Sequence, residues 1–327
     1  MSRQMRLVSL SLLSGIVLML IKFVAYFLTE SSAIFSDAAE SIVNVVASGF
    51  AYYSIYLASQ PKDENHPYGH GKVEFFSVFV EGGLIFIAGS IILIKAIYNI
   101  FFPETIDNIE EGIYLILITS LINLGVGFYL MKRGKAIRSL TIEADGKHLQ
   151  VDAISSFGLI AGLLLMKFTQ QAWIDIALSA VLGSFILYNG YKLLRKSISG
   201  LMDESDQEIV ENVVEILKNN REEDWIDVHN MRIQRYGQEL HIDCHLTLPN
   251  YYTLSQVHDR ISKFDQVLNN NMESKSEFFI HSDPCLPECC FYCKVANCPI
   301  RSEEFTTEIS WTTENVTKNM KHFRQEI

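Results

Sequence analysis

The distribution of apolar residues along the chain constrains its fold more than any other feature. Hydrophobic residues make up 49% of the 327 residues, only slightly more than in soluble proteins, but they are concentrated in the first two-thirds of the chain. A helix that crosses a bilayer needs about 20 mostly apolar residues. Six segments meet this requirement, at about 8–29, 33–58, 76–101, 112–132, 148–168 and 172–194. We therefore predict an α-helical membrane protein, with a domain of six transmembrane helices over residues 1–200.

The positions of lysine and arginine predict how this domain is oriented. The segment ends near 29–31, 103–112 and 169–173 contain neither residue, whereas the opposite ends contain Arg3, Arg6, Lys62, Lys72, Lys132, Arg133, Lys135, Arg138, Lys192, Arg195 and Lys196. Basic residues in short loops favour the cytoplasmic side. Both termini and the loop 59–74 are therefore expected in the cytoplasm. The first segment does not look like a cleaved signal peptide, which favours a bacterial inner membrane over an organelle.

Polar residues interrupt the second and fifth apolar segments at helical spacing. The motifs are SDAAESIVN and ADGKHLQVD, and their polar residues recur every three or four positions, which places them on one helical face. A charge at bilayer depth costs about 2.5–3.5 kcal/mol on insertion scales, so two such faces are expected to meet around a cation. Four side chains would supply the donors of a tetrahedral divalent site: Glu40, Asn44, His148 and Asp152.

A less specific interpretation of these two segments stays open. Asp37 and Asp145 would then be carboxylates at the membrane interface, and His148 would form structural hydrogen bonds only. This interpretation explains the polar residues of one helix more easily than those of both helices, because each polar face needs a partner within the lipid.

The loop between the second and third segments contains a further group of candidate ligands. Residues 63–70 read DENHPYGH, and Asp63, His66 and His70 are three and four positions apart. Pro67 and Gly69 oppose a helix here, so a turn would hold these side chains. Histidine and aspartate suit zinc or a similar ion. Solvated loop histidines without a metal are the alternative.

Residues 201–284 are predicted to form a soluble domain on the cytoplasmic side. Helical periodicity covers 205–219 and about 254–270, and strand patterns cover VHNMRIQRYG, QELHIDCHLTL and SEFFIHSD. The order α-β-β-α-β predicts an open sheet with two helices on one face. The domain is rich in histidine, and Asp283 follows the last of the candidate ligands His229, His241, His245, His258 and His281. They predict a site for one or two metal ions, and a polar face with incidental histidines is the alternative.

Five cysteines follow in residues 285–298, within the Cys-rich tail that we assign to 285–327. The sequence CLPECCFYCKVANC contains Cys285, Cys289, Cys290, Cys293 and Cys298, and the sixth cysteine is Cys244. Disulfides are not expected in a reducing compartment. We favour a zinc site with three or four thiolates, and a metal-capture tail or ordinary thiols are the alternatives. The polar residues from Ser302 onward are expected to be loosely ordered.

Together these motifs resemble the cation diffusion facilitator family of divalent-metal transporters, from about residue 8 to Asp283. The motifs that carry the resemblance are SDAAESIVN, QPKDENHPYGHGK, ADGKHLQVD and FFIHSDPC. The resemblance implies a homodimer of six-span protomers with a ferredoxin-like cytoplasmic domain. It also implies a transport site at Glu40, Asn44, His148 and Asp152, a loop site at Asp63, His66 and His70, and a dimer-interface site at His229, His245, His258, His281 and Asp283. Lys72 and Asp203 resemble the family's charge pair.

The resemblance further implies a secondary transporter that exports divalent metal in exchange for protons. Zinc is the first candidate, as transported and as regulatory ion. The family's zinc transporters usually have Asp or His where this chain has Glu40 and Asn44, and these harder ligands also admit manganese, iron or cobalt. Protons, metal ions, a second protomer and the lipid bilayer are the expected partners, and nucleic acid is not. The chain contains no HExxH zinc-protease motif, so an enzyme is not expected. The alternative function is a membrane-anchored metal sensor or buffer without transport.

Overall fold

The structure is a computed structural model that describes residues 3–29, 32–101, 110–169, 173–237, 239–272 and 276–325. The chain divides into two compact units, residues 1–202 and residues 203–327. Each unit is considered by itself.

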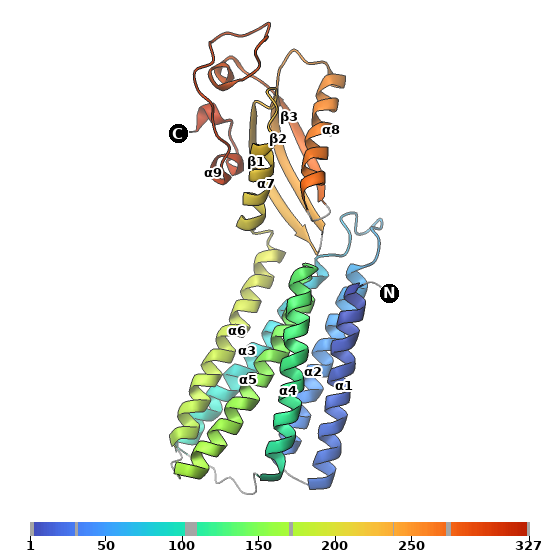
Figure 1. The fold of residues 1–327 in the computed structure, drawn as a ribbon, viewed down its shortest axis with the longest axis vertical. Helices are drawn as coiled ribbons and strands as arrows, with labels where there is room; N and C mark the ends of the chain where they lie inside the picture. The colour runs from blue at the N-terminus through green and yellow to red at the C-terminus, as the bar shows by residue number, and fades with distance from the viewer. Residues whose placement is uncertain are drawn as a thin grey trace. The chain divides into compact units, whose positions relative to one another are not determined.

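The first unit is a bundle of long helices (Figure 1). Within the described ranges they are α1 (Arg3–Thr29), α2 (Ser32–Ala58), α3 (Val73–Phe101), α4 (Glu110–Ala136), α5 (Leu140–Thr169) and α6 (Trp173–Leu201). This confirms the predicted six-helix membrane domain. By length and composition alone, the spans Arg3–Val24, Ser41–Ala58 and Val73–Phe101 are apolar enough to cross a membrane.

Glycine allows the helices to pack in close pairs. A Cβ atom built on Gly190 of α6 would lie 2.5 Å from the backbone nitrogen of Phe86 in α3. A Cβ atom on Gly146 of α5 would lie 2.5 Å from the backbone nitrogen of Met131 in α4. Small residues let membrane helices approach closely, so that van der Waals packing can hold them together where lipid gives no hydrophobic driving force. The pairs α3–α6 and α4–α5 are therefore fixed by backbone proximity.

The second unit has the predicted α-β-β-α-β order. Its elements are α7 (Gln207–Asn219), β1 (Asp227–Tyr236), β2 (Glu239–Leu248), α8 (Leu254–Asn271) and β3 (Ser276–Pro284). The sheet order is β1-β2-β3, with β1 antiparallel and β3 parallel to β2. The parallel pair requires a crossover connection, and α8 supplies it. A capping box at Thr253 and Gln256 starts this helix.

The two faces of the sheet have different chemistry because side chains alternate along a strand. On β2, Leu240, Ile242, Cys244, Leu246 and Leu248 point into an apolar core that α7 and α8 complete. The residues between them, including His241 and His245, lie on the opposite face. The helices therefore leave the histidine-bearing face of the sheet free for polar chemistry.

The C-terminal segment is ordered, contrary to the expectation of a loose tail. It contains the short elements η1 (Pro287–Tyr292), α9 (Thr313–Thr317) and η2 (His322–Arg324). We call residues 302–325 the strap. Trp311 and Val316 are 1% and 0% exposed and belong to the core of the second unit, and the Arg221 guanidinium lies 4.1 Å from the centre of the Trp311 ring. These two residues and Ile309, which is also buried, fix a segment whose polar composition predicted disorder.

Candidate metal-binding sites

Helices α2 and α5 bring together the polar side chains predicted in the membrane domain. Asn44 Nδ2 donates to Asp152 Oδ2 at 2.5 Å, and Asn44 Oδ1 lies 2.9 Å from His148 Nε2. His148 Nε2 and Asp152 Oδ2 are 3.6 Å apart. His148 is only 5% exposed, so these groups satisfy each other away from lipid. Glu40 lies on α2 one turn before Asn44, but its side chain is outside the described residues, as is that of Asp37.

The same atoms that hydrogen-bond in this group are the donors that a metal ion would need. The imidazole donates to Asn44 Oδ1 through Nε2, whereas metal ligation requires a lone pair on that nitrogen. A cation would therefore replace both hydrogen bonds of Asn44 and would require Nε2 to lose its proton. The other ring nitrogen, Nδ1, is buried without a hydrogen-bond partner among the described residues.

Asp145 is a buried residue of this region. It is 2% exposed and accepts a hydrogen bond from Ser48 Oγ at 3.0 Å. Two further buried carboxylates, Glu74 and Glu81 of α3, were not predicted from the sequence; Glu81 is 1% exposed. A single acid within the apolar motif FVEGG was the available signal, because intramembrane carboxylates are rare and generally functional.

The loop between α2 and α3 forms a compact group from Asp63, His66 and His70. Asp63 Oδ1 lies 3.0 Å from His66 Nδ1, and Asp63 Oδ2 lies 3.5 Å from His70 Nε2. The Asp63 side chain also accepts from the backbone N–H groups of Asn65 and His66 at 3.0 and 2.7 Å, and Gly69 supplies a backbone φ of 84°. The segment is not helical, and one ligand atom from each side chain lies within 4.8 Å of the others.

The Asp63 carboxyl is electrostatically suited to hold a cation. Desolvation is the largest influence on its pKa and acts to raise it, but the hydrogen bonds from His66 and the two imidazoles together outweigh it and lower the pKa. The carboxylate is therefore ionised at neutral pH. Because Asp63 and His66 are more than half exposed, an ion could reach them directly from the solvent.

The sheet of the second unit aligns three histidines in one row. His229 on β1 is paired with His245 on β2, which is paired with His281 on β3. Neighbouring ring centres are 5.0 and 4.6 Å apart. Asp283 Oδ2 lies 3.3 Å from His229 Nε2 and 3.2 Å from His245 Nδ1. His229, His245 and Asp283 therefore place three ligand atoms within 4.8 Å of one another.

Two other predicted histidines of this unit lie elsewhere. His258 is exposed on α8, which covers the apolar face of the sheet, and it is not part of the group of three. His241 is on the histidine-bearing face but lies at the other end of β2, where its Nδ1 is 3.3 Å from Glu277 Oε2. His281 is 66% exposed and its Nε2 lies 3.6 Å from Asp283 Oδ1, so it borders the group.

Sequence analysis missed the residues that surround this group. Asn230, at a bulge with φ of 51°, brings its Nδ2 to 3.1 Å from His245 Nε2. Lys321 of the strap brings its ammonium to 3.6 Å from Asp283 Oδ2. Burial is the largest influence on the Asp283 pKa and raises it, but Lys321 and the histidines reverse the effect and lower it. No sequence signal pointed to Lys321, because its contact depends on the fold of the strap.

Buried Asp227 joins the histidine row to the strap. Its Oδ1 lies 3.4 Å from His229 Nδ1, and its Oδ2 accepts from the His322 backbone N–H at 2.8 Å and from the Tyr292 hydroxyl at 3.1 Å. Desolvation raises the pKa of Asp227 most strongly, but these neighbours lower it overall. Asp227 thus lies beside the second ring nitrogen of His229, where partners of metal-binding histidines are commonly found.

Comparison with known families identifies both units. Residues 8–202 match the cation efflux transmembrane domain, and residues 205–285 match the cation efflux protein cytoplasmic domain. The chain belongs to the cation efflux family. It is a cation efflux transporter of divalent metals and not an enzyme, with several membrane spans and a cytoplasmic C-terminal domain.

Individual relatives cover most of the chain. An uncharacterized transporter of Synechocystis sp. is 31% identical over 76% of this chain and 81% of its own length. The cation-efflux pump FieF of Serratia proteamaculans is 25% identical over 82% of this chain and 89% of its own. The manganese efflux system protein MneP of Bacillus subtilis is 26% identical over 88% and 97%. The family match of the cytoplasmic domain ends at residue 285, so the strap and four of the five clustered cysteines lie beyond it.

Proposed function

We propose that this transporter exports a divalent transition-metal ion from the cytoplasm in exchange for protons, with Glu40, Asn44, His148 and Asp152 as the transport site. The observation that carries the proposal is the hydrogen-bonded group of Asn44, His148 and Asp152 between α2 and α5. Groups of this kind are expensive within a membrane, and a transported cation gives them a use that an anchored sensor or buffer would not.

Zinc is the first candidate for the exported ion. One imidazole with carboxylate oxygens suits zinc, and the neutral amide oxygen of Asn44 also suits manganese, iron or cobalt. The similarity to a protein named as a manganese efflux system supports including manganese.

Proton coupling follows from the chemistry of the ligands. Metal binding requires His148 Nε2 free of its proton and Asp152 ionised, so the ion and the protons compete for the same atoms. A site that alternates between the two sides of the membrane would then release metal outside as it takes up protons.

We also propose that the protein is a homodimer whose cytoplasmic domains bind regulatory metal, again with zinc as the first candidate. The match to the family's cytoplasmic domain supports this arrangement. His229, His245 and Asp283 supply three donors in one protomer, one fewer than a closed tetrahedral zinc site uses. Exposed His281 and His258 are candidates for completing sites at a dimer interface. The loop site at Asp63, His66 and His70 would bind metal at the cytoplasmic surface, and the membrane would be a bacterial inner membrane with both termini inside.

Metal-dependent proton flux in proteoliposomes tests the transport proposal. The native protein should couple zinc movement to opposite proton movement, and Asp152→Ala should reduce both to the level of empty liposomes, because a charged ligand and the partner of Asn44 are lost together. Glu143→Gln is the matched control: Glu143 is also a carboxylate of α5 but pairs with Lys196 at 3.3 Å, so its flux should persist.

Two results would contradict the proposal. Full flux in folded Asp152→Ala would remove this residue from the transport site. Zinc binding without flux in the native protein would favour the sensor or buffer. Competition among zinc, manganese, iron and cobalt then defines the ion. Asn44→Asp should shift the preference toward zinc, because the zinc transporters of the family usually have Asp or His at this position.

A further inference from the structure

Five of the six cysteines line a single small cavity outside the three groups described above. The cavity has a volume of about 50 Å³ and is lined by Cys285, Cys289, Cys290, Cys293 and Cys298. Cys285 follows β3, whereas the other four belong to η1 and the loop after it. Residues from two separate segments therefore converge on a space that suits one or two water molecules, or a single ion, rather than an organic ligand.

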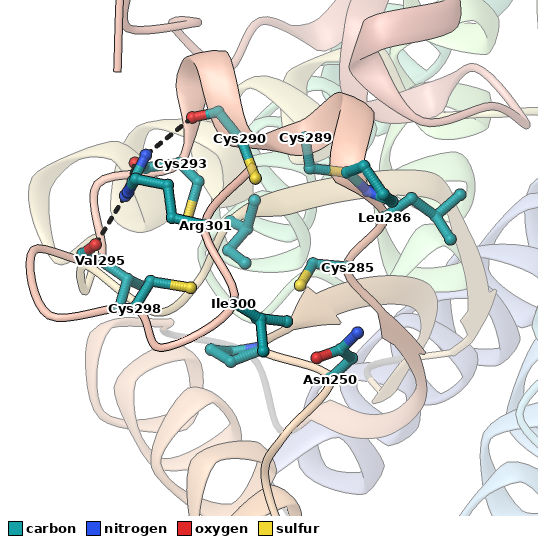
Figure 2. Close-up of a pocket in the computed structure, with 13 residues that line it drawn as sticks. Asn250, Cys285, Leu286, Cys289, Cys290, Cys293, Val295, Cys298, Ile300 and Arg301 are labelled. Carbon is teal, nitrogen blue, oxygen red and sulfur yellow. Dashed lines mark hydrogen bonds between the residues drawn. The ribbon is translucent and has the colours of Figure 1, made fainter. Parts of the chain in front are cut away.

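The directions of the side chains separate four of these cysteines from the fifth. Figure 2 shows the sulfur atoms of Cys285, Cys290, Cys293 and Cys298 pointing into the same space, whereas Cys289 turns toward the side of Leu286. Cys289 is 1% exposed and packs with Ile226 and Tyr292 in a small apolar core that also includes Cys293, so the direction of its side chain alone sets it apart. The converging cysteines have the spacing C-x4-C-x2-C-x4-C, and four thiolates are a common ligand set of structural zinc sites.

Arg301 holds the loop that carries three of these thiols. Its guanidinium donates to the backbone carbonyls of Cys290 and Cys293, each at 3.0 Å, and of Val295 at 2.6 Å (Figure 2). Ser302 Oγ lies 3.4 Å from Cys290 Sγ. One half-buried cation thus gathers the peptide groups on both sides of the CxxC turn.

The lining of the cavity restricts what can bind there. Besides the cysteines it consists of Arg301, Asn250 and apolar residues such as Pro249, Val295 and Ile300, with no carboxylate or imidazole. Thiolates without hard oxygen ligands select zinc or copper(I) over manganese, calcium or magnesium. Disulfides do not explain the cluster, because all five cysteines are free and the domain is cytoplasmic, where thiols stay reduced.

The sulfur atoms would move closer together to bind an ion. Among the described residues, the loop group and the sheet group already place three ligand atoms within 4.8 Å of one another. The sulfur atoms of the cysteines do not, although they point into the same space. A tetrahedral zinc–sulfur distance of about 2.3 Å would close it through rotation of the cysteine side chains. Each thiol must release a proton when it binds.

We propose that Cys285, Cys290, Cys293 and Cys298 form a four-thiolate zinc site that fastens the C-terminal segment to the end of β3. The site is separate from transport and from the histidine row. It would fix the start of the strap, whose far end brings Lys321 and His322 to Asp283 and Asp227.

Cobalt spectroscopy on the reduced, metal-stripped full-length protein in detergent tests this site. Cobalt(II) bound to thiolates gives an intense sulfur-to-metal charge-transfer absorption in the near ultraviolet, to which sites of histidine and aspartate do not contribute. The native protein and Cys244→Ser should both show this absorption, and added zinc should remove it. The double variant Cys290→Ser/Cys293→Ser should lose at least about nine-tenths of it, because two of four ligands are gone.

A second measurement needs no variant and so does not depend on variants folding. Zinc should protect Cys285, Cys290, Cys293 and Cys298 from alkylation, followed at each residue by mass spectrometry, and should leave Cys244 and Cys289 unchanged. Equal alkylation with and without zinc, or no charge-transfer absorption in the native protein, would overturn the proposal. An unchanged absorption in the folded double variant would do the same. Because neither measurement uses transport, failure here leaves the transport proposal intact.

Discussion

At the scale of single residues, Asn44 defines the chemistry of the membrane site. A carboxamide can donate to Asp152 and accept from His148 at the same time, which a carboxylate cannot do. It therefore keeps a histidine and an aspartate together in a low-dielectric region without adding a second negative charge. In the proposed transport site, the same amide oxygen would turn to the cation when the ion enters, so one side chain would serve both the empty and the occupied site.

Lys321 is placed to weaken metal binding at the sheet group. Its ammonium is 3.6 Å from Asp283 Oδ2, so it would repel a divalent ion bound there. Lys321→Met keeps most of the apolar stem and should tighten zinc binding about tenfold, equivalent to about 1.4 kcal/mol. Isothermal titration calorimetry with zinc measures this change in affinity, in proteins that also carry Asp152→Ala. Lys318→Met, which removes a strap lysine paired with Glu314 at 3.2 Å, is the control, and equal affinities in the two variants would refute the role of Lys321.

At the scale of elements, the close helix pairs limit how the bundle can change. The α3–α6 and α4–α5 pairs touch backbone to backbone at Gly190 and Gly146, whereas the transport group lies between α2 and α5. Elements in such tight contact move together more easily than they separate. We therefore expect α3 and α6 to move as one body during transport.

Glycine substitutions test this rigidity. Gly190→Ala places a methyl group 2.5 Å from the Phe86 nitrogen and 3.0 Å from the Gly82 carbonyl oxygen, so the helices must separate, at a cost of about 1–3 kcal/mol. The melting temperature in detergent, followed by fluorescence-detected gel filtration, should fall. Gly83→Ala on α3 meets no atom within 4 Å and should melt like the native protein. A Gly190→Ala variant with the same melting temperature as Gly83→Ala would show that the close contact at Gly190 does not limit the stability of the helix bundle.

At the scale of the whole molecule, the transporter has two units with different candidate metal ligands. The membrane unit offers an amide, a carboxylate and an imidazole at one helix contact, and the cytoplasmic unit offers a row of histidines on an open sheet face. Transport and sensing can therefore be altered independently, since no ligand is shared between the two groups.

Zinc should strengthen the dimer through the cytoplasmic unit. Mass photometry of dilute detergent-solubilised protein should show a larger dimer fraction with zinc than with chelator, because metal bound to His229, His245 and Asp283 leaves a coordination position for the partner. Asp283→Asn should weaken this response at least about tenfold. Asp243→Asn is the control, because Asp243 lies on the same strand face but pairs with Arg232 at 3.7 Å. A zinc response that Asp283→Asn leaves intact would contradict the assignment.

The sequence predicted the parts of the structure that depend on local periodicity. Helical spacing placed Asn44, His148 and Asp152 on facing helices, and strand alternation placed His245 on the polar face of the sheet. Contacts made by irregular segments were not predictable. The strap was expected to be loose because its sequence is mostly polar, and the contact of Lys321 with Asp283 depends on how the strap folds. Glu81 was not predicted because a single acidic residue forms no periodic pattern along the sequence.

His229, His245 and His281 are in register across the three strands, so an error in strand pairing would be costly for this domain. A shift of one residue in the pairing of β1 or β3 would turn imidazoles into the hydrocarbon interior and aliphatic side chains into water. The free-energy penalty for such a shift falls on the entire domain, so misaligned sheets would be too unstable to persist. The apolar core on the other face of the sheet therefore keeps the strands in register. The same register sets the spacing of the three histidines, so folding itself brings these candidate ligands together.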